Sequence, residues 1–462
     1  MSHYHFIGIG GSGMSGIAKV LQEMGHRVSG SDLAISIHAR KLAEMGAEVR
    51  AGQRADNLTG PDGHLPDVVV MSSAIPTFNE ELQAARRLGL PIKRRAEVLA
   101  EIMRSGRSVA VAGCHGKTTT SSMIALALHR GGLDPTYVVG GEVRNLGANA
   151  ALGRGSYVVA EADESDGSFL KLHPAIAVVT NIEADHLDHY GTLERIVEAF
   201  DQFLRDVPPD GLAVLGYDNA LVREIGGRYP GRKVTYALDG PADLTTTAIS
   251  FHGPGSSCRV LLKGQELGVL QLNVPGRHNV QNALAAVAVG FEAGLSFAAI
   301  AEALHDFIGA ERRFERVGEA RGVTVIDDYA HHPTEVAATL RAARLQNFGR
   351  VICVFQPHRY TRTKHLVKEF GSAFAAADLL FLMDIYSAGE TPIPGITGET
   401  LLNQVRESGH RHVEYHPRRE DLLDALARAV RPGDLVLTTG AGNVTTLGPE
   451  LLKRLEAGPR FS

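Results

Sequence analysis

The stretch VAGCHGKTTT, residues 111–120, overlaps an apolar run at 108–112 and opens an apolar-periodic segment that ends at Arg130. This order predicts a buried strand, a glycine loop and a helix. Glycines let backbone N–H groups approach phosphate oxygens, the helix N-terminus adds positive potential, and a hydroxyl after the lysine can ligate Mg²⁺. The usual P-loop has a glycine five residues before Gly116, where this chain has Val111, so the loop is a shortened variant. It predicts a triphosphate site; the alternative is a glycine-rich turn beside a solvated lysine.

Length and composition fit a globular enzyme. The 462 residues are enough for about three domains, and 44% hydrophobic and 21% charged residues are ordinary values. A net charge of -5 gives no support to a nucleic-acid or membrane partner. No apolar run approaches a bilayer span and the N-terminus does not resemble a signal peptide, so we expect a cytoplasmic protein. The widely spaced Cys114, Cys258 and Cys353 are expected to be reduced thiols.

The first ninety residues alternate between strand and helix patterns. We expect strands at 3–7, 27–30 and 67–71, and helices at 14–24 and 79–88. Residues 8–13 match Gly-x-Gly-x-x-Gly, and Asp32 follows about twenty residues later. NAD, FAD or a UDP-sugar would satisfy this fingerprint, and a purely structural turn is the other interpretation.

The rest of the chain predicts two further α/β units. In the middle unit, strands at 157–160 and 175–180 end in polar residues, a weakly patterned stretch at 230–275 predicts short antiparallel strands, and a helix follows at 279–289. The third unit has expected strands at 323–326, 351–355, 379–383 and 435–438, with a helix at 333–344. Polar strand tips meet at one edge of such a sheet, so each unit has a candidate functional rim.

Two phosphate loops in one chain separate the functional classes. A dehydrogenase has no use for the Lys117-Thr118 loop, and a transport ATPase has no use for the first glycine loop. A ligase that uses ATP on a nucleotide-linked substrate needs both.

Seven segments in order resemble the Mur ligases of peptidoglycan synthesis. They are FIGIGGSGMSG at 6–16, GCHGKTTT at 113–120, EADESD at 161–166, TNIEADHLD at 180–188, RRFE at 312–315, DDYAHHP at 327–333 and QPHRYTR at 356–362. The resemblance implies an α/β fold of three domains: a Rossmann-like UDP-sugar domain at 1–95, a central P-loop ATPase domain at 96–315, and a mobile Rossmann-like C-terminal domain at 316–462 that binds amino acid and ATP.

The resemblance also implies a reaction and its cofactors. ATP phosphorylates the lactyl carboxylate of UDP-N-acetylmuramate, and the amine of L-alanine attacks the acyl phosphate to form an amide. Mg²⁺ is the expected metal, with Mn²⁺ as a substitute. Nucleic acids and membranes are not expected partners, and the oligomeric state stays open.

Site residues follow from the resemblance one by one. The expected ATP contacts are Gly113, Cys114, His115, Gly116, Lys117, Thr118, Thr119, Asn279, Asn282 and Arg313. The expected metal ligands are Thr118, Glu161 and His186. The UDP-sugar should meet Gly10, Gly11, Ser12, Gly13, Ser31, Asp32 and Ser72, and L-alanine should meet Tyr329, His331, Arg359 and Arg362. Lys117, His331, Arg359 and Arg362 are the expected catalytic residues. Arg312 remains an alternative to Arg313 as the ATP contact. Asp328 and Asp384 are weaker candidates, which could orient these cations or contact the nucleotide.

Two departures from the family pattern carry expectations of their own. Cys114 stands where the family usually has threonine, and its place at a helix N-terminus predicts a lowered thiol pKa and alkylation against which ATP protects. Residues 187–208 contain no lysine, whereas related ligases that add later residues carry one there; this matches the alanine-adding branch.

Three other functions stay open on the sequence. A nicotinamide-dependent oxidoreductase would use the first fingerprint, and a regulatory protein would bind ATP without chemistry. Within the ligases, a recycling enzyme that attaches a whole peptide to the same UDP-sugar is the nearest rival.

Overall fold

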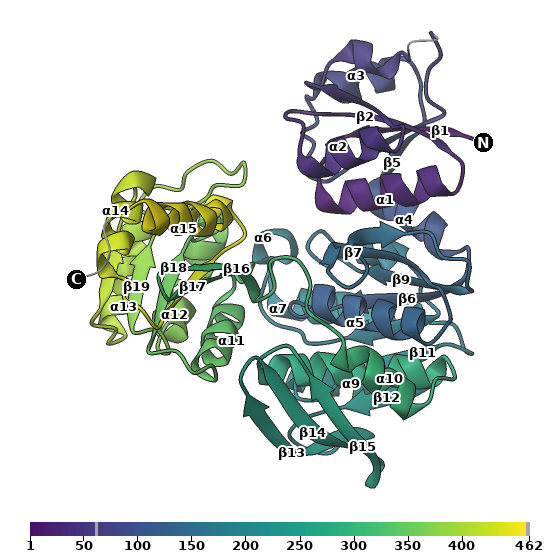
Figure 1. Ribbon diagram of the computed structural model, residues 1–462. Coiled ribbons are helices and arrows are strands. Elements are labelled where there is room, and N and C mark those ends of the chain that lie inside the picture. The colour runs from purple at the N-terminus through teal and green to yellow at the C-terminus, as the bar shows by residue number, and fades with distance from the viewer. Residues whose placement is uncertain (61–62, 459–462) are drawn as a thin grey trace.

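The computed structural model describes residues 1–60 and 63–458. Within these ranges the chain forms three α/β domains, each built on its own sheet, in the order expected from the sequence. Figure 1 shows the N-terminal domain stacked on the central domain, with the C-terminal domain beside the latter. No helix in the described ranges is long and apolar enough to cross a membrane.

The N-terminal domain has a five-stranded parallel sheet of order β3-β2-β1-β4-β5. Its strands are β1 (His3–Ile7), β2 (Arg27–Asp32), β3 (Glu48–Ala51), β4 (Val68–Met71) and β5 (Ile92–Arg94). Its helices are α1 (Ser12–Glu23), α2 (Ile37–Glu44), the short η1 (Ala55–Leu58) and α3 (Glu80–Arg87), and α4 (Arg95–Met103) connects it to the central domain. The first glycine loop connects β1 to α1, as predicted.

The central domain has a ten-stranded sheet of order β15-β14-β13-β12-β11-β10-β6-β9-β7-β8. Its strands are β6 (Arg107–Ala112), β7 (Thr136–Val143), β8 (Ala148–Ala151), β9 (Tyr157–Glu161), β10 (Ile176–Val179), β11 (Leu212–Gly216), β12 (Lys233–Tyr236), β13 (Leu244–His252), β14 (Gly255–Leu262) and β15 (Gln265–Leu272). The predicted antiparallel strands are β13 to β15, and they extend the parallel part of this sheet. The sequence patterns did not predict β7 and β8.

Helices cover both faces of the central sheet. They are α5 (Lys117–Arg130), η2 (Ser168–Lys171), α6 (Leu187–Tyr190), α7 (Leu193–Arg205), α8 (Ala220–Arg228), α9 (Arg277–Glu292) and α10 (Phe297–His305). One core packs α5, α9 and α10 against the sheet. The other core joins α7 and α8 to α1 and α4, so the N-terminal and central domains share buried apolar surface.

The C-terminal domain has a six-stranded sheet of order β16-β17-β21-β18-β19-β20, in which only the β16–β17 pair is antiparallel. Its strands are β16 (Glu315–Ala320), β17 (Val323–Asp328), β18 (Arg350–Phe355), β19 (Leu379–Leu382), β20 (Val413–Tyr415) and β21 (Asp434–Thr439). Its helices are α11 (Pro333–Arg344), α12 (Tyr360–Ala373), α13 (Gly398–Glu407), α14 (Arg419–Ala429), η3 (Asn443–Thr446) and α15 (Leu447–Ala457).

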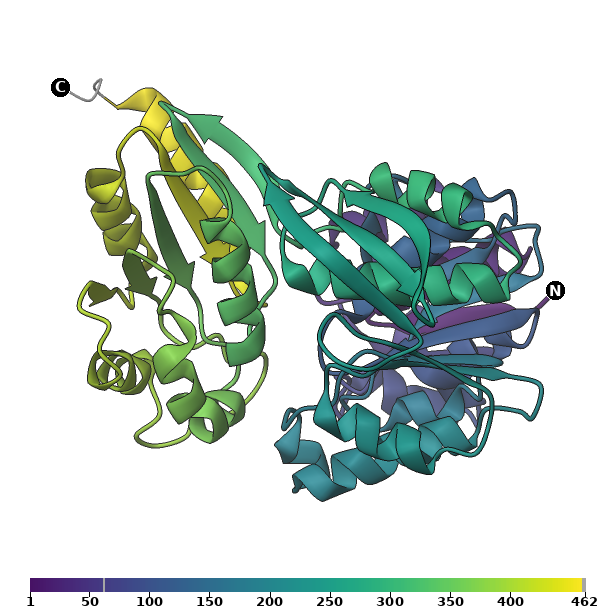
Figure 2. The same cartoon turned by 90° about the horizontal axis from the view of Figure 1, so that it is seen from below.

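The C-terminal sheet is covered on both faces. Helices α11 to α13 pack on one face, and α14 and α15 pack on the other. Viewed from below, the carboxyl-end loops of this domain face the central domain (Figure 2). The strand-tip residues of the two domains therefore meet across one seam.

Candidate active site

The central glycine loop is built as its sequence predicts. Buried β6 ends at Ala112, and α5 begins at Lys117 with its first N–H groups at the loop. Gly113 has φ 135° and Gly116 has φ 83°, and a Cβ there would lie 2.0 Å from Thr180 Oγ1 and 2.7 Å from Asn282 Oδ1, respectively. Only glycine fits both positions, so the backbone stays open to a phosphate.

The side chain of Lys117 lies among oxygen atoms of backbone carbonyls and a carboxylate. Its Nζ donates to the carbonyl of Gly113 at 2.7 Å and lies 2.8 Å from Oε2 of Glu164. Burial opposes the charge of the amine, but the neighbouring carboxylates, Glu164 foremost, raise its pKa above the ordinary value. The lysine therefore presents a fixed positive charge at the loop.

Oxygen ligands for a divalent cation stand beside the lysine. Thr118 Oγ1 donates to Glu161 Oε2 at 2.9 Å, and the same carboxylate oxygen accepts from the backbone N–H of Gly140. His186 Nε2 lies 3.6 Å from Oε1 of Glu164, and burial lowers the pKa of its ring, so the ring is neutral and has a free lone pair. A hydroxyl and a carboxylate at this spacing fit Mg²⁺.

A cavity of 280 Å³ lies between the central and C-terminal domains next to the glycine loop. Among its lining residues are the predicted ATP contacts His115, Gly116, Thr119, Asn279, Asn282 and Arg313. Asp328 lines it too, and burial raises the pKa of this carboxyl group to about 6. The geometry thus brings residues from α5, α9 and the β17 tip to one cavity.

The structure separates the two adjacent arginines. Arg313 Nη2 lies 3.3 Å from Thr118 Oγ1, at the glycine loop. Arg312 turns toward the C-terminal domain, where Nε donates to Asp327 Oδ2 at 2.8 Å and Nη2 donates to the carbonyl of Gly440 at 2.6 Å. Arg313 is therefore the arginine that lies at the glycine loop.

A second cavity of 720 Å³ runs from the N-terminal glycine loop to Thr118 and Glu161. Six of the predicted UDP-sugar residues line it: Gly10, Gly11, Ser12, Gly13, Asp32 and Ser72. Asp32 Oδ2 accepts from the N–H of Gly10 at 2.8 Å and so holds the loop in shape. The cavity also contains Arg95, which the sequence patterns did not single out, and which pairs with Asp163 at 2.9 Å.

Ser31, which was also predicted to contact the UDP-sugar, does not line this cavity. The Ser31 side chain is fully buried, and its hydroxyl donates to Glu81 Oε2 at 2.5 Å. Glu81 in turn lies 2.6 Å from His5 Nε2. Only the carbonyl of Ser31 serves the loop, where it accepts from the N–H groups of Gly8 and Ile9.

Sequence reasoning missed this buried polar cluster under the first glycine loop. The signal was present, because His3 and His5 alternate along β1 and therefore share one sheet face with Ser29 and Ser31 of β2.

The predicted L-alanine residues lie near the seam between the domains. Arg362 pairs with Asp185 at 3.1 Å in a buried contact, and Arg359 Nη1 lies 3.5 Å from Asp188 Oδ2. Burial opposes ionisation of Asp185, but Arg362 holds its pKa well below the ordinary range. The two arginines thus stand beside His186 rather than in the nucleotide cavity.

Tyr329 and His331 come from the loop after β17. The ring of Tyr329 packs under the guanidinium groups of Arg312 and Arg313, at 4.9 and 5.2 Å. His331 Nδ1 donates to the carbonyl of Tyr329 at 3.0 Å, and burial lowers the pKa of the ring to about 3. The ring is neutral, with its Nε2 lone pair free of this bond. The Asp384 carboxylate caps backbone N–H groups of Ile385 and Gly398, which is a structural role.

The expectation of a lowered pKa for the Cys114 thiol is wrong. Its side chain is 7% exposed, and burial together with the charges of Glu164 and Asp185 raises the thiol pKa well above the ordinary value. Sγ accepts from the N–H of Glu183 at 3.1 Å, so it contributes to the packing of the loop. Tertiary burial outweighs the helix N-terminus here.

These features define a three-domain α/β protein with two glycine loops, each of which lies beside a cavity. The chain belongs to the Mur ligase family. Residues 3–107 match "Mur ligase family, catalytic domain", residues 111–290 the Mur ligase middle domain, and residues 312–442 "Mur ligase, glutamate ligase domain". The family consists of ligases that use ATP, and this chain is one of them.

Relatives of nearly equal length agree with this assignment. The chain is 52% identical to the UDP-N-acetylmuramate–L-alanine ligase of Pelotomaculum thermopropionicum over 460 residues, which are 99% of each chain. It is 50% identical to the ligase of the same name from Sorangium cellulosum, covering 98% of this chain and 97% of that one. The solved UDP-N-acetylmuramate-alanine ligase of Thermotoga maritima superposes with a TM-score of 0.83 at 28% identity, over 99% and 100% of the two chains.

Proposed function

We propose that this chain joins L-alanine to the lactyl carboxylate of UDP-N-acetylmuramate and converts ATP to ADP and phosphate. The observation that best supports this proposal is the 720 Å³ cavity, which connects the N-terminal glycine loop to Thr118 and Glu161. A UDP-sugar seated at one end directs its acyl group toward the other, where ATP delivers its γ-phosphoryl group. Identity of about half of all residues to ligases of that name supports the choice of substrate.

In the first step, a carboxylate oxygen of the sugar attacks the γ-phosphorus, the bond to the β-γ bridging oxygen breaks, and ADP leaves. Lys117 and Arg313 offset the charge that develops on the phosphoryl oxygens. Thr118, Glu161 and His186 would hold Mg²⁺, which would supply positive charge to offset that of the phosphates.

In the second step, the alanine nitrogen attacks the acyl carbon, the amide C–N bond forms, and phosphate leaves with the C–O bond electrons. The neutral His331 accepts a hydrogen bond from the amine through Nε2. Arg359 and Arg362 suit a carboxylate and a phosphate, because a guanidinium group binds such oxygens in pairs. The amine proton is released to solvent.

The domain assignments belong to the same proposal: residues 1–95 hold the UDP-sugar, 96–315 hold ATP, and 316–462 hold alanine and complete the ATP site. We place the reaction in the cytoplasm, where ATP is available.

The test is phosphate release by purified protein with UDP-N-acetylmuramate, ATP and Mg²⁺, with and without L-alanine. We expect alanine-dependent phosphate release and a product whose mass equals the sugar plus alanine minus water. An alanine-containing peptide in place of L-alanine tests the recycling ligase, and NAD(P)H absorbance tests the oxidoreductase. Activity with the peptide alone would assign the chain to the recycling enzymes.

A further inference from the structure

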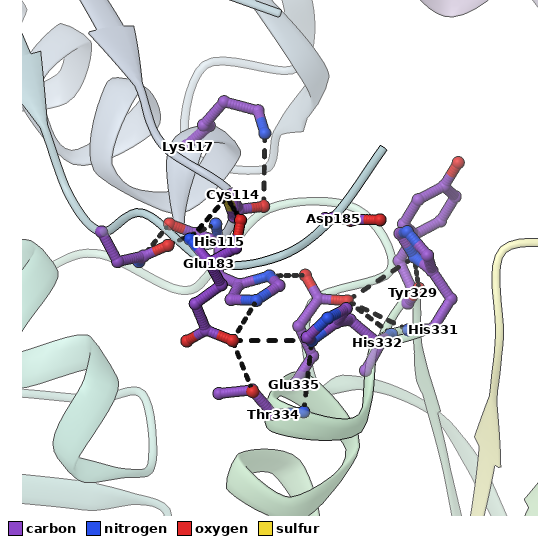
Figure 3. A network of polar contacts seen from close by, with 12 residues as sticks. Cys114, His115, Lys117, Glu183, Asp185, Tyr329, His331, His332, Thr334 and Glu335 are labelled. Carbon is purple, nitrogen blue, oxygen red and sulfur yellow. Dashed lines mark hydrogen bonds and ion pairs between the residues drawn. The ribbon is translucent and has the colours of Figure 1, made fainter. Parts of the chain in front are cut away.

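The backbone of His115 is held in place within the central glycine loop by three hydrogen bonds. Its backbone N–H donates to Asn181 Oδ1 at 2.8 Å, and its carbonyl accepts from Thr180 Oγ1 at 2.6 Å and Asn181 Nδ2 at 2.9 Å. The tip of β10 therefore holds the loop at this residue. The ring projects from the loop toward the C-terminal domain, as Figure 3 shows.

The ring of His115 lies between two carboxylates from different domains. Nε2 is 3.3 Å from Glu183 Oε2 in the central domain, and Nδ1 is 3.2 Å from Glu335 Oε1 in the C-terminal domain (Figure 3). Burial opposes the charge, but Glu335 and Glu183 raise the pKa of His115 to about 10. The ring is an imidazolium whose Nε2 donates to Glu183 and whose Nδ1 forms an ion pair with Glu335.

Glu335 connects this ring to the loop of the C-terminal domain that carries Tyr329 and His331, which we call the substrate loop. While Oε1 faces His115, Oε2 accepts from the backbone N–H groups of His331 at 3.0 Å and His332 at 3.2 Å. Glu335 is the third residue of α11 and closes a capping box there. A shift of His115 is thus transmitted to the backbone of His331 by one carboxylate.

A second contact strengthens the same seam. Thr334 Oγ1 donates to Glu183 Oε2 at 2.7 Å. His115, Glu183, Thr334 and Glu335 all line the 280 Å³ nucleotide cavity. The pairing therefore spans the two domains in the wall of that cavity, and it exists only while the domains are in contact.

A metal site is the competing explanation for part of this cluster. One ligand atom from each of His115, Glu183 and His332 lies within 4.8 Å of the other two. These atoms already have partners, because His115 pairs with Glu183 and His332 Nδ1 accepts from the N–H of Thr334 at 3.4 Å. The observations favour the ion pair between domains.

We propose that the His115–Glu335 ion pair positions the C-terminal domain over the central glycine loop, so that the loop carrying Tyr329 and His331 reaches the acyl phosphate. Glu335 and His115 are then positioning residues for the ligase reaction, with Thr334 in support. This inference rests on the proposed function.

The main variant is Glu335→Gln. Glutamine keeps an oxygen for the capping box but removes the charge that faces His115. A displacement of the substrate loop by about 1 Å predicts a kcat lower by roughly 100-fold. The dissociation constant of UDP-N-acetylmuramate should stay near the wild-type value, because Glu335 does not line the 720 Å³ cavity. The matched control is Glu319→Gln, which removes an exposed carboxylate of the same domain and should leave kcat unchanged.

Two further readouts separate positioning from general damage. His115→Gln and the double variant complete a mutant cycle with Glu335→Gln. If the two residues act as one pair, the double variant should lose no more kcat than the worse of the two single variants. Small-angle scattering with ADP and UDP-N-acetylmuramate should give Glu335→Gln a larger radius of gyration than wild type. If Glu335→Gln does not fold, kcat and the radius of gyration are measured on His115→Gln instead.

Wild-type kcat in Glu335→Gln, fully additive losses, or an unchanged radius of gyration would each overturn the inference. One equivalent of Zn²⁺ bound by wild-type protein and lost in His332→Asn would also overturn it, in favour of the metal site. Failure of the proposed function is distinct from all of these, since the wild-type protein itself would then form no alanine adduct.

Discussion

The Nζ atom of Lys117 lies 2.8 Å from Oε2 of Glu164, and the two side chains are 14% and 2% exposed. Burial raises the pKa of Glu164 to about 7, so this carboxyl group titrates near neutral pH. The lysine at the glycine loop therefore has a partner that can lose its charge by taking up a proton. An arriving phosphate can replace Glu164 without leaving an isolated buried carboxylate.

Lys117→Ala tests the two loops as separate sites. We expect amide formation to fall by about 1,000-fold, because the charge that opposes the phosphates is lost. Folding should survive, since Glu164 can stay protonated once its partner is gone. Calorimetry should find UDP-N-acetylmuramate binding largely intact. The control Lys453→Ala removes an exposed lysine of α15 and should be fully active; loss of both activity and sugar binding in Lys117→Ala would mean that the two sites are not separate.

Arg312 and Arg313 should give opposite phenotypes. Arg313→Ala should lower kcat by about 100-fold with an unchanged free energy of unfolding, because its guanidinium group faces the glycine loop. Arg312→Ala should lower the free energy of unfolding by about 2 kcal/mol, because buried Asp327 loses a charged partner. We would measure urea unfolding and steady-state kinetics on both variants, with exposed Arg316→Ala as the reference. These measurements separate a loss of stability from a loss of kcat. Equal loss of kcat at both positions would contradict the assignment.

Cys114 should react slowly with alkylating reagents in the folded protein. The thiol is buried and its pKa is well above the ordinary value, so little thiolate is exposed at neutral pH. Peptide mass spectrometry after timed iodoacetamide treatment should find Cys114 labelled quickly only in urea. Rapid labelling of native protein that ATP prevents would restore the expectation drawn from the sequence.

The carboxyl group of Asp328 should make stability depend on pH. Burial raises its pKa to about 6 in the folded state, above the ordinary value of 3.8. The unfolded chain therefore loses this proton first, and the contribution of Asp328 to stability falls as pH rises from about 4 to about 6, then stays constant. A shift of this size corresponds to about 3 kcal/mol. Urea unfolding of wild type and Asp328→Asn at several pH values should show this difference; parallel curves would contradict the raised pKa.

Much of the fold was predictable because its signals are local. Helix α11 begins at Pro333, as expected, since proline suits the first helical turn and Glu335 completes a capping box. Strands β7 and β8 were missed because Gly140 and Gly141 interrupt an ordinary strand pattern, and the segment is a strand through the pairing of β7 with β9 and with β8. Edge strands β16 and β20 depend on neighbours in the same way.

The choice between Arg312 and Arg313 shows where sequence patterns stop. The two residues are adjacent and chemically identical, so spacing cannot separate them. In the structure Arg312 has φ 55° and Phe314 has φ 52°, and the two side chains end at different partners, Arg312 at Asp327 and Arg313 at Thr118. The backbone conformation, held by the contacts of Arg312 with Asp327 and Gly440, selects Arg313 for the loop.

The amino-acid sequence by itself determined the two glycine loops, the lysine and hydroxyl that follow one of them, and the order of the three α/β units. Each of these depends on residues that are neighbours in the chain. Only the tertiary structure decided which charges meet: Arg362 with Asp185, Glu335 with His115, and Ser31 with buried Glu81 rather than with a ligand. The physical reason is that ion pairing and desolvation depend on distance and burial, which are set when segments far apart in the chain pack together.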